Sequence, residues 1–345
     1  MKRVIAIPLF ALLIAGASFA GFHSLASGRV ALASPSTAAD LFADLPTATS
    51  PAAIYIDMKS LRASAFLSKI AAMAPEVKKD ANYTEFVNAT GFNYETDLDQ
   101  VAIVTDPATQ GNSAQVIAQG RFDEAKIAAY AQAKGKITAK SSGHHYEIKT
   151  DDAGNILTME FISPNRLRVT SVSTKKSDSA ANGSSAAPAA IPMREHISRV
   201  SDAALFAIFH VNGMKDMNAK PAGSMATTQM AQLAQSVQWV TLTGNPEATD
   251  LRISVEAECD TAANAQQLAS GLNTLKMMAP MFLSQANSPQ STQQIPPEVV
   301  AALTQFISSF QISSDDTHAK LSVLFTQQII DALSTMSKSR MSASR

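Results

Sequence analysis

The feature that most constrains the fold of this sequence is a strand, a helix cap and a helix, which occur in this order twice. Apolar and polar residues alternate over residues 251–259, which indicates a strand with one buried face. Asp260 and Thr261 then provide a helix N-cap, and apolar residues recur at helical spacing after them. Residues 114–122 alternate in the same way and lead through Asp123 into a second helix. The sequence therefore predicts an internal duplication.

Further predicted strands match between the two halves of the chain. In the first half they are residues 53–56, 101–105, 156–162 and 167–172, and in the second half residues 206–211, 239–243, 310–313 and 319–325. Turn residues separate several of them into hairpins, at positions 164–165, 244–246 and 315–316. An amphipathic helix is expected after Ser60, and Pro280 is expected to end or kink the helix that follows Thr261.

The shared order is strand, helix, strand, strand, helix and then more strands, which is the split βαβ order of ferredoxin-like domains. This order predicts an α+β fold. It consists of two tandem repeats of a ferredoxin-like, βαββαβ-type unit with mainly antiparallel sheets, after an N-terminal signal segment.

Composition shifts predict where the chain divides. The predicted segments are a signal peptide at 1–20 (or an uncleaved anchor to residue 22), a flexible lead at 21–44, a first repeat at 45–172, a low-complexity linker at 173–192, a second repeat at 193–337 with a polar loop at 284–297, and a disordered tail at 338–345. A length of 345 residues agrees with two domains.

The N-terminal segment has the layout of a secretory signal. Lys2 and Arg3 precede an uncharged, largely apolar stretch over residues 4–22. Small residues allow cleavage before Gly21 or before Ser34, and the stretch is also long enough for an uncleaved membrane anchor. The chain is therefore predicted to be exported, to the periplasm or the exterior, with the membrane contacted only through this segment.

Charge and composition exclude several classes of partner. Lys and Arg number 28 against 29 Asp and Glu, so there is no basic excess for a phosphate backbone. Aromatic residues make up only 6% of the chain, which argues against a base-stacking platform. One cysteine cannot form an internal disulfide, so the core itself must stabilise the exported protein. Nucleic-acid binding is not expected.

A histidine-rich strand is the first candidate for chemistry. His145 and Glu147 share one face of the strand predicted there, and His144 lies on the other face. A catalytic zinc ion usually has three protein ligands, and no further histidine lies at a ligand-type spacing from these. The pattern favours an ordinary polar strand edge over a metal site.

Sulfur-containing side chains are the second candidate. Met277, Met278 and Met281 cluster on one predicted helix, and thioethers are ligands for Cu(I). Methionine is also an ordinary core residue, and Leu275 next to the cluster favours that interpretation. Cys259 falls on the apolar face of its strand, where a thiol is protonated and unreactive.

Other catalytic patterns are weak or missing. The Ser173 to Lys176 spacing matches a Ser-x-x-Lys pair, but it falls in the low-complexity linker, where no scaffold would activate the serine. The sequence contains no glycine-rich phosphate loop and no calcium-loop spacing. No catalytic residue, metal or cofactor is therefore predicted.

Several segments of the first half resemble uncharacterised exported bacterial proteins. They are Leu45 with Pro46, residues 53–58, Leu61, Arg62 and Ser64, residues 92–99 and residues 121–126. The resemblance implies export and no assigned activity.

These observations predict a non-enzymatic binding or interaction module of the cell envelope, whose partner is a protein or an apolar ligand. Two alternatives stay open at this point. One is an exported hydrolase whose site is assembled from dispersed residues, and the other is an envelope domain anchored by an uncleaved N-terminal helix.

Overall fold

A computed structural model describes residues 37–67, 81–105, 114–134, 137–138, 144–149, 155–173, 191–211, 236–286 and 297–332. The chain divides into two compact units. Unit 1 comprises Met1–Ala63 and Ser68–Asp202, and unit 2 comprises Ser64–Leu67 and Ala203–Arg345. Both units combine helices with antiparallel strands, so the predicted α+β class is confirmed.

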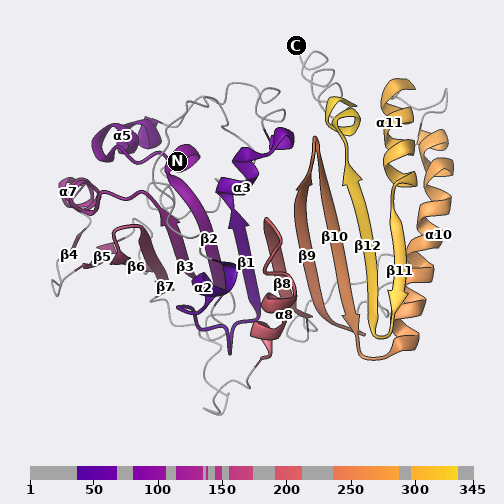
Figure 1. Cartoon of the computed structure of the whole chain (residues 1–345), viewed down its shortest axis with the longest axis horizontal. Helices are drawn as coiled ribbons and strands as arrows, with labels where there is room; N and C mark the ends of the chain where they lie inside the picture. Colours follow the sequence, from indigo (N-terminus) through magenta and orange to yellow (C-terminus); the bar gives the residue numbers. More distant parts are fainter. Residues whose placement is uncertain are drawn as a thin grey trace. The chain divides into compact units, whose positions relative to one another are not determined.

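Unit 1 contains a twisted antiparallel sheet with strand order β1-β2-β3-β7-β6-β5-β4 (Figure 1). Its strands are β1 (Ala52–Asp57), β2 (Leu98–Thr105), β3 (Ala114–Gly120), β4 (Ile137–Thr138), β5 (His145–Lys149), β6 (Asn155–Ser163) and β7 (Arg166–Ser173). Its helices are α2 (Ala38–Phe42), α3 (Met58–Ala63), α5 (Ala81–Thr90), α6 (Tyr94–Asp97), α7 (Glu124–Ala133) and α8 (Met193–Arg199).

The core of unit 1 lies on one face of this sheet. Alternate residues of β2, β3, β6 and β7 point into it, among them Val101, Val116 and Met159, and α7 contributes Ile127. Ala102 and Val104 are also buried, on the opposite face of β2. Because both faces of β2 are covered, it is apolar without interruption from Val101 to Val104 and does not show a simple alternation there.

Unit 2 contains an antiparallel set of strands in the order β8-β9-β10-β12-β11. These are β8 (Leu205–His210), β9 (Val237–Glu247), β10 (Asp250–Cys259), β11 (Gln311–Asp315) and β12 (His318–Phe325), with helices α10 (Ala262–Ala286) and α11 (Pro297–Ser308). Figure 1 shows α10 running alongside β11, with α11 next to it. The α10 residues Ala265 and Ala269 pack against Cys259 and Ala319 on the strands.

Most predicted elements are confirmed, and the helix caps are among them. The hydroxyl Oγ1 of Thr261 accepts a hydrogen bond from the backbone N of Asn264, 3.2 Å away, at the start of α10. Asp123 accepts one from the backbone N of Lys126 at 3.1 Å and so caps α7. These side chains satisfy backbone N–H groups that a helix start leaves without an intrahelical partner.

The hairpin of β9 and β10 differs from the prediction. The turn was expected at residues 244–246, but β9 continues through them, and the reversal lies beyond Glu247, where Ala248 has a φ of 52°. Pro246 is tolerated inside the strand because β8 begins opposite Gly244 and does not reach position 246, so β8 needs no hydrogen bond from that position.

Two helix boundaries also differ from the prediction. Pro280 does not end α10, which continues to Ala286 and therefore includes the first residues of the predicted polar loop. Helix α3 begins at Met58 and not after Ser60, because the carboxylate of Asp57 accepts hydrogen bonds from the backbone N and the hydroxyl of Ser60.

The predicted ferredoxin-like topology is not confirmed. In a ferredoxin-like unit the first two strands run parallel with another strand between them. Here β1 and β2 are direct antiparallel neighbours, and so are β8 and β9. Only the later part of each unit has the split βαβ order, with β3 and β6 on either side of β7 and with β10 and β11 on either side of β12. Periodicity identifies a strand, whereas pairing depends on contacts far apart in sequence.

Several predicted segments lie wholly or largely outside the described residues. These are the signal segment, most of the flexible lead, residues 174–190 of the linker, residues 287–296 of the polar loop and the C-terminal tail. Residues 193–199, which the sequence predicts to begin the second repeat, form helix α8 and belong to unit 1. No helix among the described residues is both long and apolar enough to span a bilayer.

Candidate functional site

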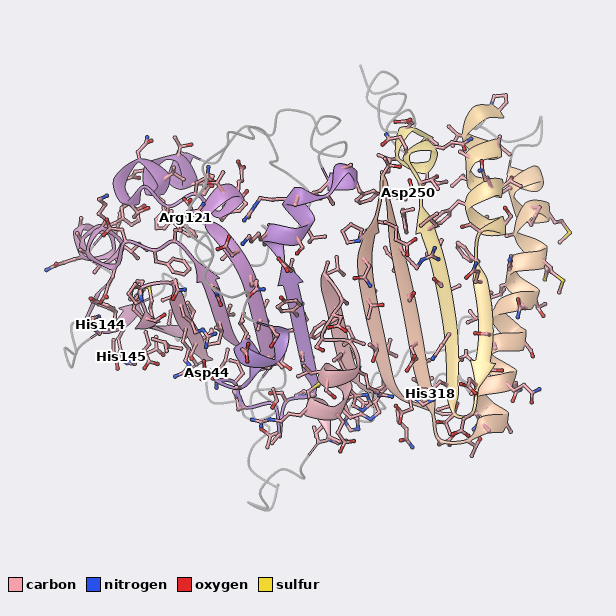
Figure 2. The ribbon with its side chains drawn as sticks, viewed as in Figure 1. Asp44, Arg121, His144, His145, Asp250 and His318 are labelled. Atoms are coloured by element: carbon pink, nitrogen blue, oxygen red, sulfur yellow. The ribbon has the colours of Figure 1, made fainter. Side chains whose placement is uncertain are left out.

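The histidine-rich strand forms a polar cluster with Glu124, a residue that the sequence does not identify as a candidate. Atom Nδ1 of His144 lies 2.6 Å from Oε2 of Glu124, the first residue of α7. The hydroxyl of Tyr146 donates to the other oxygen of the same carboxylate at 2.7 Å. Figure 2 shows His144 and His145 close together in unit 1, where β5 begins. The structure thus brings His144 to Glu124 and Tyr146.

The other two predicted candidates are neighbours of Tyr146 in the chain and make neither of these contacts with Glu124. His145 and Glu147 follow in β5, where they pair with Glu160 and Thr158 of β6. Among the residues that the structure describes, no group of three or more His, Cys, Asp or Glu side chains is placed to hold a metal ion. The side chain of His144 is 69% exposed and has one carboxylate partner, so the cluster anchors β5 to α7.

A chain of aromatic contacts lies beneath this cluster. The contacts run from Tyr130 through Phe86, Phe92, Phe122 and Phe161 to Tyr146, with ring centroids 5.2 to 6.4 Å apart. Most of these pairs have the edge-to-face geometry that aromatic quadrupoles favour. The chain of rings joins α5, α7, β5 and β6 into one packed layer and thereby fixes the position of Tyr146 under Glu124.

We expect the substitution Glu124→Gln to lower the pKa of Tyr146 toward the ordinary tyrosine value of about 10. The hydrogen bond to Glu124 raises the pKa of Tyr146, and partial burial and the negative charge add to the rise. The amide of glutamine can still accept the hydrogen bond but carries no charge. The measurement is a pH titration followed by NMR of ring-labelled tyrosine.

Tyr130 is the internal control for this titration. Burial raises its pKa, and its charged neighbours are Lys134 and Glu85, not Glu124. A shift of Tyr130 as large as that of Tyr146, or no shift of Tyr146, would contradict the assigned contact.

The remaining described histidines have structural neighbours. His318 on β12 lies 3.4 Å from Glu258 and 3.7 Å from Glu256, both on β10 (Figure 2). The ring of His210 packs on Trp239 with centroids 4.6 Å apart, and burial lowers the pKa of His210. His196 is buried in α8 and contacts Arg199. Each histidine thus stabilises a local contact between elements or turns.

Several arginines of unit 1 likewise hold segments together. Arg121 binds Asp97 through Nη2 at 2.7 Å, which ties the end of β3 to α6. Arg166 on β7 binds Asp44 at 2.9 Å and so holds the residues after α2 against the sheet (Figure 2). Arg62 on α3 binds Asp99 of β2 in the same way, with Nη2 3.2 Å from Oδ1.

Cys259 is 3% exposed at the end of β10. Burial raises the pKa of its thiol, which keeps the sulfur protonated. The thiolate is the reactive form of cysteine, so this residue is a core side chain, in agreement with its place on the apolar face of the strand.

The methionine cluster on α10 is exposed, contrary to the core role that the sequence favoured. Met277, Met281 and Met278 are 73%, 56% and 38% exposed, and Leu275 is 47% exposed. Among the described residues, one further large apolar side chain, Ile162, is exposed. At 3.6 residues per turn Met281 lies about 160° around the helix from the buried Ala265. We call Leu275, Met277, Met278 and Met281 the α10 outer face.

This face carries no charged side chain of its own. Lys276 is the only charged residue within Ala262–Ala286, and its ammonium group donates to the backbone carbonyl of Phe310. Residue 276 lies on the side of α10 that packs on the strands, so its charge is directed away from the outer face. Single exposed apolar residues are common on proteins, whereas these four lie on one helix within seven residues of one another.

The sequence alone predicts only part of the α10 outer face and of the cluster around Glu124. The lack of acidic residues within α10 is visible in the sequence, but the helical pattern placed Leu275 in the core stripe. Glu124 gave no signal, because a glutamate after a cap residue is ordinary in a first helical turn.

Comparisons with known proteins add little to this picture. No family model and no curated protein matches the sequence. The structure is similar to crystal form III of TP0453, with a TM-score of 0.40 and 8% identity, covering 88% of this chain and 99% of that chain. Crystal forms I and IV of TP0453 give TM-scores of 0.37, also at 8% identity, over 84% and 83% of this chain and 94% of those chains. Similarity at this level carries no function over to this protein.

Proposed function

We propose that this protein is an exported, non-enzymatic interaction module that binds an uncharged, apolar surface of a partner protein through the α10 outer face. The exposure of three methionines and a leucine on one helix is the observation that carries the proposal. Burial of these side chains against a partner would remove apolar surface from water, which is the main driving force of protein association.

The chemistry of the partner follows from the charge of the helix. A charged group pressed against the α10 outer face would lose its water without gaining a counter-charge, since Lys276 is engaged with Phe310 on the other side. The partner surface is therefore uncharged. Methionine side chains are flexible and polarizable, so they adapt to the shape of such a surface.

A protein partner suits this chain better than a lipid surface or a nucleic acid. Helices that lie on membranes usually carry Lys and Arg beside their apolar face, and α10 has one lysine, which is directed inward. The whole sequence has a formal net charge of -1, so no long-range attraction to phosphate groups is available.

The proposal includes two tandem repeats, although not of the ferredoxin-like kind. It is supported by the common strand order of the units, in which β1, β2, β3, β7 and β6 correspond to β8, β9, β10, β12 and β11. In both units a helical segment connects the third strand to the closing hairpin. Export is supported by Lys2, Arg3 and the apolar stretch after them, and the intact mass of protein recovered from the cell envelope tests it.

The docking proposal is tested with two triple variants of the full chain. One changes Met277, Met278 and Met281 to glutamine, and the other changes the same three residues to leucine. Leucine keeps the apolar surface, whereas glutamine places a polar amide at each position. With the dye bis-ANS as an apolar probe, we expect the glutamine variant to bind about tenfold more weakly and the leucine variant to bind like wild type.

Photo-crosslinking in the native envelope then tests for a protein partner. A crosslinking amino acid at position 277 should give one adduct of defined mass, and the same group at Gln267, an exposed polar position on α10, should not. Changing Met278 and Met281 to glutamine should abolish the adduct. Identical adducts from both positions, or bis-ANS binding that the glutamine variant retains in full, would overturn the proposal.

A further inference from the structure

We infer that Met277 and Met281 are oxidation sites, at which peroxides convert the thioethers to sulfoxides and thereby abolish docking at the α10 outer face. The part that concerns docking rests on the proposed function above. The part that concerns the sites themselves rests on the exposure of the two side chains.

The methionines that the structure describes fall into two groups of very different exposure. Met277 and Met281 are 73% and 56% exposed on α10, whereas Met58, Met159 and Met193 in unit 1 are 5%, 1% and 0% exposed. A peroxide must reach the sulfur atom to react with it, and oxidation of sulfur-containing side chains follows exposure. The α10 side chains should therefore react first, and the buried ones only when the protein opens.

Cysteine does not compete with these sites. Cys259 is 3% exposed, and the raised pKa of its thiol keeps it out of the reactive thiolate form. Met277 and Met281 are thus the most exposed sulfur-containing side chains among the described residues.

The chemical step is a two-electron oxygen transfer. A lone pair of the methionine sulfur attacks one oxygen of hydrogen peroxide, the O–O bond breaks, and the second oxygen leaves as water after proton transfer. The thioether is oxidised to the sulfoxide and the peroxide is reduced to water. A methionine sulfoxide reductase reverses the change.

Methionine sulfoxide, the product, is polar, whereas the methionine side chain is apolar. A sulfoxide has a strongly polar S–O bond that accepts hydrogen bonds, and an uncharged apolar partner surface offers no donor to it. Burying this group without a donor costs free energy, as it does for any polar group. Oxidation should therefore act on docking as the change of methionine to glutamine does, but reversibly.

The experiment treats the folded full-length protein and its Met277→Leu, Met278→Leu, Met281→Leu variant with hydrogen peroxide. Peptide mapping by mass spectrometry follows each methionine over time, and bis-ANS fluorescence reports the apolar face. In the wild type we expect Met277 and Met281 to gain one oxygen each well before Met58, Met159 and Met193. Probe binding should fall about tenfold, as for the glutamine variant, and recover on addition of the reductase.

The leucine variant separates the two proposals. It has no thioether on the α10 outer face, so the peroxide should leave its probe binding at the level measured for the same variant before treatment, whatever that level is. Oxidation of the buried methionines at the same rate as Met277 and Met281, or full probe binding by the sulfoxide form, would overturn this inference and leave the docking surface standing. Failure of the untreated wild type to bind the probe would instead overturn the proposed function.

Discussion

The substitution Phe161→Ala should lower the free energy of unfolding of unit 1 by about 3–5 kcal/mol. The Phe161 side chain is 5% exposed and belongs to the buried cluster of unit 1. It also lies in the middle of the aromatic chain, with its ring centroid 6.4 Å from that of Phe122 and 6.1 Å from that of Tyr146. Alanine would leave a cavity in this buried cluster on the face of the sheet and remove both ring contacts.

The aromatic residues also provide the measurement. All five tyrosines lie in unit 1, at positions 55, 83, 94, 130 and 146, and the single tryptophan, Trp239, lies in unit 2. Urea unfolding followed through the tyrosine near-UV signal therefore reports on unit 1, and tryptophan fluorescence reports on unit 2. We expect the tyrosine transition to move to lower urea for Phe161→Ala.

Two control variants make this prediction specific. Ile162 is the next residue on β6 and is 39% exposed, so Ile162→Ala should change stability by only about 0.5 kcal/mol. Phe161→Leu keeps most of the apolar volume and should cost clearly less than alanine. If Ile162→Ala and Phe161→Ala destabilised unit 1 equally, the ring cluster would not be the core that the structure describes.

The substitution Gly120→Ala should destabilise unit 1 by about 1–3 kcal/mol, by overpacking and not by loss of contacts. A Cβ atom at position 120 would lie 2.3 Å from the carbonyl oxygen of Asp97 and 3.2 Å from the Cα of Leu98. These are backbone atoms and cannot turn away as a side chain would. The neighbouring backbone is also fixed, since the backbone N of Arg121 donates to the same oxygen of Asp97 at 2.8 Å.

Gly91 is a useful comparison with Gly120, because a side chain there is limited by the backbone conformation and not by space. A Cβ atom there would meet nothing within 4 Å, but its φ of +74° is a conformation that L-residues other than Asn and Asp rarely adopt. Gly91→Asn should therefore be tolerated better than Gly91→Ala. At Gly120, where space is the limit, asparagine should be at least as harmful as alanine. Urea unfolding of the four variants, followed by the tyrosine signal, separates strain from steric overlap.

The local elements of this protein could be predicted from sequence because their signals are local. Alternation identified β10, Asp123 and Thr261 marked the starts of α7 and α10, and the residues at 164–165 marked the turn between β6 and β7. Each of these signals depends on a few neighbouring residues, whose periodicity, capping oxygens or turn preferences act within one or two turns of chain.

The pairing of the strands and the candidate surface were decided by tertiary structure. The ferredoxin-like prediction failed at β1 and β2, and at β8 and β9, because backbone hydrogen bonds between strands carry no local signature in the sequence. Glu124 meets His144 and Tyr146 only because α7 and β5 pack together over the aromatic chain.

The exposure of the α10 methionines is the clearest example of a property that the sequence does not determine. A group of Met and Leu residues at helical spacing is compatible with a buried stripe and with an exposed one, because the pattern of hydrophobic residues is the same in both cases. What decides between them is which side of the helix the strands occupy, and Ala265 and Ala269 take that side here. The sequence by itself determined that the helix exists and carries almost no charge, and the packing of the alanines left its methionines facing outward.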